Sequence, residues 1–457
     1  MRALLFLLPC LMLYRYLSDS GMAGMLMRLV FLGAFGAVGW LMVTSASKPR
    51  LAPETRWFLV MFAIFGLQYS LMISEYMTIM GGISRSFMLL LVAVPLGSVI
   101  LGALLRDRLP WPLPVCQTGL AMLGLAFLGF VAERLGFANV HGTNIEASGT
   151  EIISRERMGL TFIGGVVPSA TFLAIAMSSL VASLFQGRTF IRVATGTSLL
   201  ICTTLVLLTG TRGALSIVFA VSVLIGLGVV QRLRRRPLRS AILALLAVIL
   251  IPALYPKVFP FLDNLELNLA LEPLRRDSQS TVFDLTGRVD AWERSLDYFA
   301  ESRNLLLGYG PEAEIVAGLS AELGSLPHPA FAGRDDLHAH NLLYNLLFSG
   351  GACMVIPYLV MMALAIKRAL IHSEDPRVAS LLGMLLAWIG IGIHESLLWT
   401  HIYFFYFVLC GILAELYLAT PESGPQTATA KSGVRTPRSA TAKSSVPALL
   451  PGQRPAI

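Results

Sequence analysis

The sequence predicts an all-α membrane protein that crosses the bilayer about twelve times. Hydrophobic residues make up 55% of the 457-residue chain and charged residues only 14%, whereas roughly a quarter of a soluble protein is charged. Apolar segments of about 20 residues, the length that a helix needs to cross a bilayer, recur along the chain. Lys and Arg collect in the short loops between them. The net charge of +8 therefore reflects membrane topology, and we expect no nucleic-acid partner.

The first apolar run lies between Arg2 and Arg15. It has no small-residue cleavage site, so we interpret it as a membrane helix and not as a signal peptide. The five cysteines all lie in apolar segments without metal-ligand spacing, which indicates a packing role. The predicted spans are 3–20, 22–45, 57–74, 86–105, 114–132, 167–186, 192–209, 213–230, 240–256, 342–366, 378–397 and 401–419.

Five basic loops determine the predicted orientation. With twelve crossings all five fall on one side, which the positive-inside rule identifies as cytoplasmic. Both termini are then cytoplasmic, and the long polar stretch 257–341 lies on the outer side. The sequence thus predicts a membrane domain of residues 1–419 that contains this loop, followed by a disordered tail of residues 420–457. The basic loops contain Lys48 to Arg56, Arg106 to Arg108, Arg188 to Arg192, Arg232 to Arg236 and Lys367 to Arg368.

Two arginines stand near the outer ends of predicted spans. Arg212 lies in Thr-Arg-Gly between two spans, where it either snorkels to the interface or binds an anionic headgroup beside a flexible glycine turn. Arg157 precedes the helix that contains Pro168. Arg157 on its own is also compatible with an ordinary surface charge.

Arg288 begins an amphipathic pattern in the long loop. Trp292, Leu296 and Phe299 follow at helical spacing, and Thr286 is a candidate N-cap. Arg288 then stands in the first turn, where the helix dipole disfavours a cation. This position suits an anion-binding site, since free N–H groups and a guanidinium would meet there. The alternative is a salt bridge to Asp284 or Asp290.

The long loop ends in His338-Ala339-His340-Asn341. A histidine titrates near neutral pH and suits a general base, although it can also simply hydrogen-bond within a loop. Zinc binding would need a third ligand from His328, Asp335 or Asp336, and no spacing fixes one, so we expect neither a metal nor another cofactor. His394-Glu395 forms a further polar pair on the same predicted face and either orients a partner or lines a cavity.

Together these residues place arginines and histidines on the outer face of a lipid-embedded bundle. That arrangement suits an anionic, lipid-linked substrate such as a polyprenyl diphosphate. Diphosphate leaves readily when guanidinium groups match its developing charge. A histidine would then deprotonate an incoming sugar hydroxyl.

The order of these motifs resembles the O-antigen ligase and polymerase superfamily over about residues 55–415. The matching features are Thr-Arg-Gly at a helix junction, Thr-Gly-Arg before an aromatic helix, Gly-Tyr-Gly, and His-Asn before an apolar helix. The resemblance implies a GT-C-like membrane fold, an undecaprenyl-diphosphate-linked glycan donor, and transfer at the outer face of the inner membrane without a metal. It assigns diphosphate binding to Arg212, Arg288 and Arg157, and acceptor activation to His338 or His340. Val167-Pro168-Ser169 departs from the Asn-Pro-Asn that the family often has after its first arginine, so the role of Arg157 stays open.

From the residues and the resemblance we predict an O-antigen ligase of the bacterial inner membrane that transfers glycan to lipid A–core. The alternatives are a polysaccharide polymerase with the same donor, a protein O-oligosaccharyltransferase, and a membrane transporter. A transporter is disfavoured because the chain has no evident internal repeat and no charged pair at mid-membrane depth. The sequence leaves the oligomeric state, the glycan and the acceptor sugar open.

Overall fold

The fold was analysed in a computed structural model of the chain. In the part that it describes, regular secondary structure is α-helical throughout. The chain divides into two compact units, Met1–Thr420 and Pro421–Ile457, and every described residue lies in the first. The structure describes residues 53–61, 63–64, 67, 166–186, 189–209, 212–268, 288–301, 304–310, 313–325, 337–397, 409, 412–413, 416–417 and 419–420.

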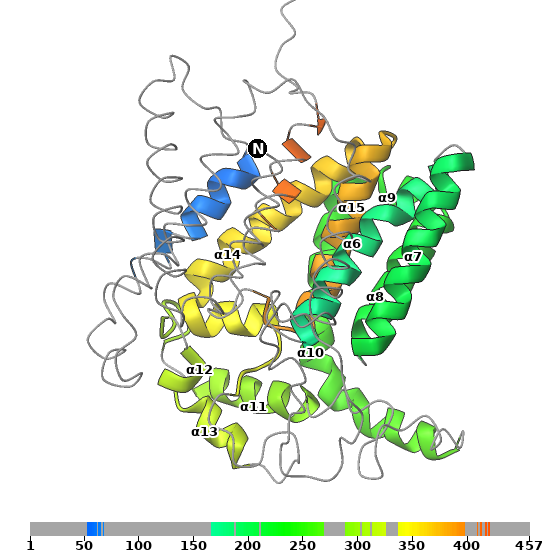
Figure 1. The fold of residues 1–457 in the computed structure, drawn as a ribbon. Helices are drawn as coiled ribbons and strands as arrows, with labels where there is room; N and C mark the ends of the chain where they lie inside the picture. The colour runs from blue at the N-terminus through cyan, green and yellow to red at the C-terminus, as the bar shows by residue number, and fades with distance from the viewer. Residues whose placement is uncertain are drawn as a thin grey trace, which may run out of the picture. The chain divides into compact units, whose positions relative to one another are not determined.

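A short helical segment at 53–61 precedes the main series of helices, and the long helices gather into a bundle (Figure 1). The named helices are α6 Val166–Gln186, α7 Thr189–Thr209, α8 Arg212–Gly226, α9 Val229–Leu233, α10 Pro237–Asn268, α11 Arg288–Glu301, α12 Ala313–Val316, α13 Leu319–Gly324, α14 Leu342–Ile371 and α15 Pro376–Gly392.

The bundle core forms where α15 packs against α6 and α8. A Cβ atom at Gly383 would lie 2.3 Å from the carbonyl oxygen of Ser178, and one at Gly390 would lie 3.3 Å from the side chain of Ile217. Small residues let the helix backbones approach this closely, which favours helix association in a membrane. Trp388 of α15 is fully buried and donates to the hydroxyl of Tyr358 on α14 (3.2 Å), which joins α15 to that helix as well.

Two of the described helices are long and apolar enough to cross a membrane, Pro237–Leu262 within α10 and Leu342–Ile371. Shorter apolar helices cover Ala170–Val181, Gly213–Gly226 and Pro376–Gly392. Most of the α10 span is exposed on the protein, as a lipid-facing helix would be. The figure of twelve crossings stays a prediction. The predicted spans 3–20, 22–45, 86–105 and 114–132 lie outside the described residues, as does most of 401–419.

Several predicted helix ends were wrong, among them the ends of the spans 240–256 and 378–397. The span predicted at 240–256 continues to Asn268 through three prolines, which a helix tolerates where neighbouring packing compensates for the lost hydrogen bonds. Tyr255 of this helix meets Trp292 of α11 edge-on at 6.0 Å between ring centroids. The span predicted at 378–397 ends instead at Gly392, and His394 and Glu395 follow it in a turn.

The helix α14 is broken at Gly351, where φ is 60° and ψ is −161°. The loop 305–310 docks into the break and completes its backbone hydrogen bonds. Tyr309 and Gly310 donate to the carbonyls of Phe348 and Ser349, while Ala352 and Cys353 donate to Leu305 and Leu306, all at 2.6–3.2 Å. Non-helical backbone survives at a membrane only when its polar groups are paired in this way.

The Gly-Tyr-Gly motif of the sequence is the part of this loop that faces the break. Gly308 has φ 69°, and a Cβ atom there would lie 2.5 Å from the carbonyl oxygen of Phe348. Only glycine combines that conformation with that approach. The motif therefore fixes the first turns of α14, residues 342–350, at the end of the bundle where the long loop lies.

A second hydrophobic cluster, here called the loop cluster, joins the long loop to this end of α14. The helix predicted after Arg288 is confirmed as α11, with Trp292 and Phe299 buried and Leu296 half-buried on its inner face. The buried members of the loop cluster are Ala291, Trp292, Phe299, Ala313, Leu319, Leu323, Leu337, Ala339, Tyr344 and Phe348.

Candidate functional site

The N-terminal ends of three helices lie against one short turn, Ile393-His394-Glu395. Arg288, the first residue of α11, contacts both His394 and Glu395. Asn341, the N-cap of α14, donates from Nδ2 to the carbonyl of Ile393 (2.6 Å). At the start of α8, a Cβ atom at Gly213 would lie 2.5 Å from Nε2 of His394. The N-terminal ends of α8, α11 and α14 therefore meet at this turn, and such ends favour anions.

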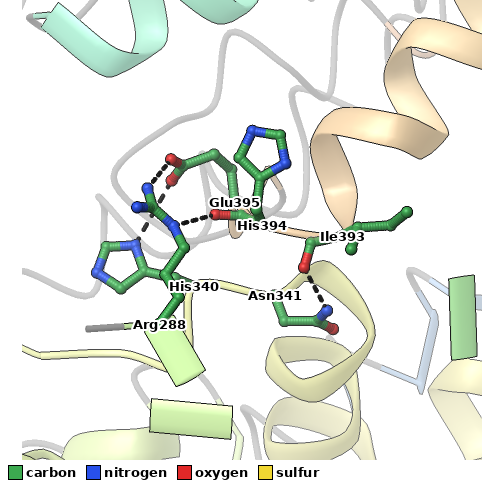
Figure 2. Close-up of polar contacts among 6 residues, drawn as sticks. All are labelled: Arg288, His340, Asn341, Ile393, His394 and Glu395. Carbon is green, nitrogen blue, oxygen red and sulfur yellow. Dashed lines mark hydrogen bonds and ion pairs between the residues drawn. The ribbon is translucent and has the colours of Figure 1, made fainter. Parts of the chain in front are cut away.

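The guanidinium of Arg288 is held by the turn from two sides (Figure 2). Its Nε donates to the carbonyl oxygen of His394 (2.8 Å), and its Nη2 forms an ion pair with Oε1 of Glu395. One carboxylate against Arg288 is therefore Glu395, 107 residues later in the chain. The alternative pairing with Asp284 or Asp290 stays a prediction, and Asp284 lies outside the described residues. The ion pair is largely buried, with 17% of the Arg288 side chain and 9% of the Glu395 side chain exposed.

Glu395 also faces His340. Nδ1 of His340 lies 3.5 Å from Oε2 of Glu395, so one carboxylate spans an arginine and a histidine. Burial raises the pKa of the Glu395 carboxyl, but the charge of Arg288 and the contact with His340 outweigh burial and hold the pKa well below its usual range. Glu395 is thus ionised at neutral pH. An ionised carboxylate at Nδ1 orients an imidazole and stabilises its protonated form.

The backbone at His340 has φ 46°, a conformation that L residues rarely adopt. Such conformations persist where the surroundings enforce them, and they gather at functional sites. Contacts of the next residue, Asn341, help to hold His340 in this backbone conformation. Asn341 is fully buried, accepts from the backbone N–H of Tyr344 as the cap of α14 (3.0 Å), and ties the chain to Ile393.

His338 lies next to His340, with 4.0 Å between ring centroids and the rings near perpendicular. In Figure 2 the ring of His394 and the carboxylate of Glu395 point in different directions from the 393–395 turn. Burial lowers the pKa of His394 to about 4; Glu395 opposes this shift and Arg288 adds to it. His394 is therefore neutral at physiological pH and fills the contact with Gly213.

The other residues predicted from the sequence fall into three groups. Arg212 is confirmed at a helix start, since it opens α8 directly before Gly213. Arg157 and Thr286 lie outside the described residues, so their roles stay predictions. No three His, Cys, Asp or Glu side chains of the described residues group as a metal site. The candidate third ligands His328, Asp335 and Asp336 lie outside that part of the chain.

Sequence reasoning noted His394-Glu395 but did not include Glu395 among the site residues. The signal was available, because a carboxylate at the end of an apolar segment is costly without a partner. Sequence reasoning did not identify the break in α14 at Gly351. The sequence feature that could have indicated it is the pair Gly350-Gly351 within an apolar run. Sequence reasoning also missed Glu314, a buried carboxyl beside Ala339, whose neighbours in the sequence give no sign of burial.

Comparison with protein families gives a match over part of the chain. Residues 197–359 match the O-antigen ligase family. This range includes the α7–α8 junction with Arg212, the helix of Arg288, and the His338–Asn341 segment. These residues form an O-antigen ligase domain. A comparison with curated proteins gives no match.

The ligase domain and the apolar helices together make the chain a membrane protein. The family contains enzymes of the ligase and polymerase type that transfer glycans and use lipid-linked glycan substrates. Arg288 and the two histidines lie within the matched range. Glu395 lies beyond its end and reaches the site through the fold.

Proposed function

We propose that this protein is an O-antigen ligase. It moves a preassembled glycan from undecaprenyl diphosphate to a sugar hydroxyl of lipid A–core. The observation that carries the proposal is the meeting of three helix N-termini with Arg288, Glu395 and His340 at the 393–395 turn. A diphosphate needs concentrated positive potential, and a hydroxyl nucleophile needs a base beside it.

The donor diphosphate binds at the helix N-termini, between Arg212 and Arg288. The contacts of Arg288 with the carbonyl of His394 and with Glu395 fix the plane of its guanidinium before substrate arrives. A preorganised cation stabilises charge as it develops on the leaving diphosphate. Because guanidinium groups and helix N-termini supply this stabilisation, the proposed reaction has no step that requires a metal ion. Arg157 contributes to the same subsite.

His340 is the proposed base, and Glu395 its orienting partner. The acceptor hydroxyl gives its proton to Nε2 of His340, and its oxygen forms the new bond to the anomeric carbon. The bond from that carbon to the diphosphate oxygen breaks, and undecaprenyl diphosphate leaves. Attack from the face opposite the leaving group inverts the anomeric centre, with no covalent enzyme intermediate. The imidazolium is stabilised by the ionised Glu395. His338 packs against His340 and helps to position it.

The site is proposed to face the periplasm, with both termini in the cytoplasm. Two ion pairs at the other end of the bundle support this orientation. Arg234 of the basic loop after α9 pairs with Glu374, and Arg368 near the end of α14 pairs with Glu54. Residues of three predicted cytoplasmic loops thus gather at the end of α14 and α15 away from His340.

The test is reconstitution of the purified protein with undecaprenyl-diphosphate glycan and lipid A–core. The proposal expects capped lipopolysaccharide without added ATP. Absence of product with a verified donor and acceptor would overturn it. In a deletion strain, loss of a ligase leaves long glycan chains on undecaprenyl diphosphate. Loss of a polymerase instead leaves core that bears single repeat units, and that outcome would move the assignment to the polymerase.

A further inference from the structure

Three consecutive leucines form an exposed turn in the long loop. Leu305, Leu306 and Leu307, here called the leucine turn, have exposed fractions of 39%, 64% and 54%. The backbone N–H of Gly308 donates to the carbonyl of Asn304 (2.7 Å) and closes the turn. A single exposed leucine is ordinary in any protein, but three in succession at the tip of a closed turn form an apolar surface that needs a partner.

The backbone of the leucine turn is bonded to the part of α14 that follows the break. The carbonyls of Leu305 and Leu306 accept from the backbone N–H groups of Ala352 and Cys353, at 2.8 and 3.2 Å. These polar groups of the turn are therefore paired within the protein, while its side chains point outward and are apolar. Hydrocarbon accepts irregular backbone only where its polar groups are paired in this way.

The part of α14 after the break has one apolar side that is only partly buried. Residues on this side recur at helical spacing of three or four, and Ile356 among them is 56% exposed. Every member is apolar except the last, a lysine of a predicted cytoplasmic loop. The leucine turn adjoins the other end, at Cys353. The side is here called the outward stripe and consists of Cys353, Ile356, Val360, Leu364 and Lys367.

The outward stripe alone is too short to span the hydrocarbon of a bilayer. From Cys353 to Lys367 the helix rises about 21 Å at 1.5 Å per residue, and the hydrocarbon core is about 30 Å thick. A snorkelling Lys367 side chain adds only a few ångströms. Before the break, α14 is almost entirely buried by protein. The hydrocarbon therefore continues past Cys353 to the level of the leucine turn.

The exposed residues change character between α11 and the leucine turn. On α11 every exposed side chain except Ala300 is charged, as on a helix in water. Tyr298 and Tyr309, on either side of the turn in the sequence, are half-buried with their hydroxyls 3.2 Å apart. Tyrosine favours the boundary between water and hydrocarbon. The charged residues of α11 are Asp290, Glu293, Arg294, Asp297 and Glu301.

We propose that the leucine turn inserts into the bilayer leaflet on the side of the long loop, where phospholipid acyl chains cover its three side chains. Lipid is the partner that fits, because the turn continues the outward stripe of α14 and adds the apolar height that the stripe lacks. The turn thereby fixes the long loop to the membrane surface at the break in α14. This role does not depend on glycan transfer, since it requires only that α14 crosses a membrane.

Spin labels on the full chain test what covers the turn. In a background with the five native cysteines replaced by alanine, single labels are attached at Leu306→Cys, at Ile356→Cys, and at Glu322→Cys. Glu322 on α13 is the aqueous reference, because its side chain is 49% exposed. Each protein is reconstituted in vesicles of phosphatidylethanolamine and phosphatidylglycerol. Collision rates of the label are then measured with oxygen, which concentrates in hydrocarbon, and with a water-soluble nickel chelate.

The label at Leu306→Cys should collide more with oxygen than with the chelate, as the label at Ile356→Cys should. The label at Glu322→Cys should show the reverse order. A label at Leu306→Cys that collides mainly with the chelate would overturn the proposal, because the turn would then lie in water. A label there that neither reagent reaches would overturn it as well, because a second copy or another part of the chain would then cover the turn.

A charge in the turn tests the same proposal without a label. A carboxylate in hydrocarbon is costly, so Leu306→Asp should drive the turn out of the bilayer and open its bonds to α14. Amide hydrogen exchange at Ala352 and Cys353 should rise about tenfold or more, which a part of that cost supplies. Leu306→Met, which stays apolar, should exchange like wild type. Equal exchange in the two variants would contradict insertion, and where Leu306→Asp fails to fold, the label at Leu306→Cys still decides.

Discussion

Two arginine–glutamate ion pairs lie at opposite ends of the helical bundle and differ in the groups that surround them. Arg368 and Glu54 are as buried as Arg288 and Glu395, with side-chain exposures of 20% and 1% against 17% and 9%. Arg368 also donates to the hydroxyl of Thr420 (3.2 Å) and lies over the ring of Tyr417 (5.4 Å). Each of these contacts of the Arg368 guanidinium joins one part of the chain to another.

The pair at the loop end is surrounded by groups that can react or bind. Glu395 reaches His340 as well as Arg288, and the starts of three helices meet beside it. We infer that a buried arginine does not by itself mark a site in a membrane protein, since the contacts of Arg368 join parts of the chain through the same kind of ion pair. The shared carboxylate, the histidine and the converging helix dipoles make the difference.

The largest expected effect comes from removing each arginine. Arg288→Ala should reduce transfer on the order of 10³-fold, because it removes a preorganised charge at the leaving group. Arg368→Ala should leave the rate per folded molecule unchanged. Both variants should lose stability, about 3–5 kcal/mol by the usual cost of an unpaired buried charge. The rate must therefore be normalised to folded protein, measured by size-exclusion chromatography after reconstitution. An equal loss of the normalised rate in both variants would show that the two ion pairs do not differ in their effect on transfer.

Substitutions of histidines test the same difference between the two ends of the bundle. His340→Ala should lower kcat by about 10²–10⁴-fold, the range for loss of a general base. His338→Ala should cost less, since His338 acts on His340 through ring packing. His372 is the matched control, because it is the C-cap of α14 at the other end and lies near the charge of Arg368. Single-turnover transfer with bound donor separates these steps from binding. A larger loss in His338→Ala than in His340→Ala would exchange the two roles.

A smaller effect is expected where α8 touches the turn. Gly213→Ala would place a methyl group 2.5 Å from Nε2 of His394, so the imidazole and the 393–395 turn must shift. Transfer should fall by up to about 10²-fold, as small misplacements in a site do. Gly196→Ala on α7 is the control, since among the described residues its new methyl group would meet only Leu184, at 4.0 Å. If Gly213→Ala transfers at the rate of Gly196→Ala, the start of α8 does not contribute to the site.

The smallest effects concern pH, and they separate the two buried glutamates of the loop end. The pKa of Glu314 is raised from 4.5 to about 7, so its stabilising contribution is complete below 4.5 and is lost as the pH rises through 7. Glu314→Gln should therefore melt a few degrees higher than wild type at about pH 8, with the gap closing towards about pH 5.

The pKa of Glu395 is shifted the other way. Its contribution is present above its ordinary value and is lost only as the pH falls through the lowered pKa. Glu395→Gln should therefore melt below wild type across about pH 5 to 8. Melting curves of both variants in the same detergent check both signs. A gap for Glu314→Gln that widens towards acid pH would contradict the raised pKa.

Helix positions and single motifs were predictable from the sequence, because they depend on local patterns. The amphipathic spacing of Trp292 and Phe299 predicted α11, and His340-Asn341 before an apolar run predicted the start of α14. The pairing of Arg288 with Glu395 was not predictable, since it spans 107 residues and depends on where α15 ends. The break at Gly351 depends on a loop that docks from elsewhere in the chain. Local periodicity carries no information about either.

The central claim is that the Arg288–Glu395 pair belongs to the transfer site and the Arg368–Glu54 pair to the scaffold. The most direct test neutralises each pair as a whole, since replacing both partners avoids leaving one buried charge. Arg288→Met/Glu395→Gln and Arg368→Met/Glu54→Gln should both insert and melt close to wild type. In the reconstituted assay, the first should lose transfer on the order of 10³-fold and the second should transfer at the wild-type rate. Wild-type transfer by the first variant, or an equal loss in both, would contradict the account.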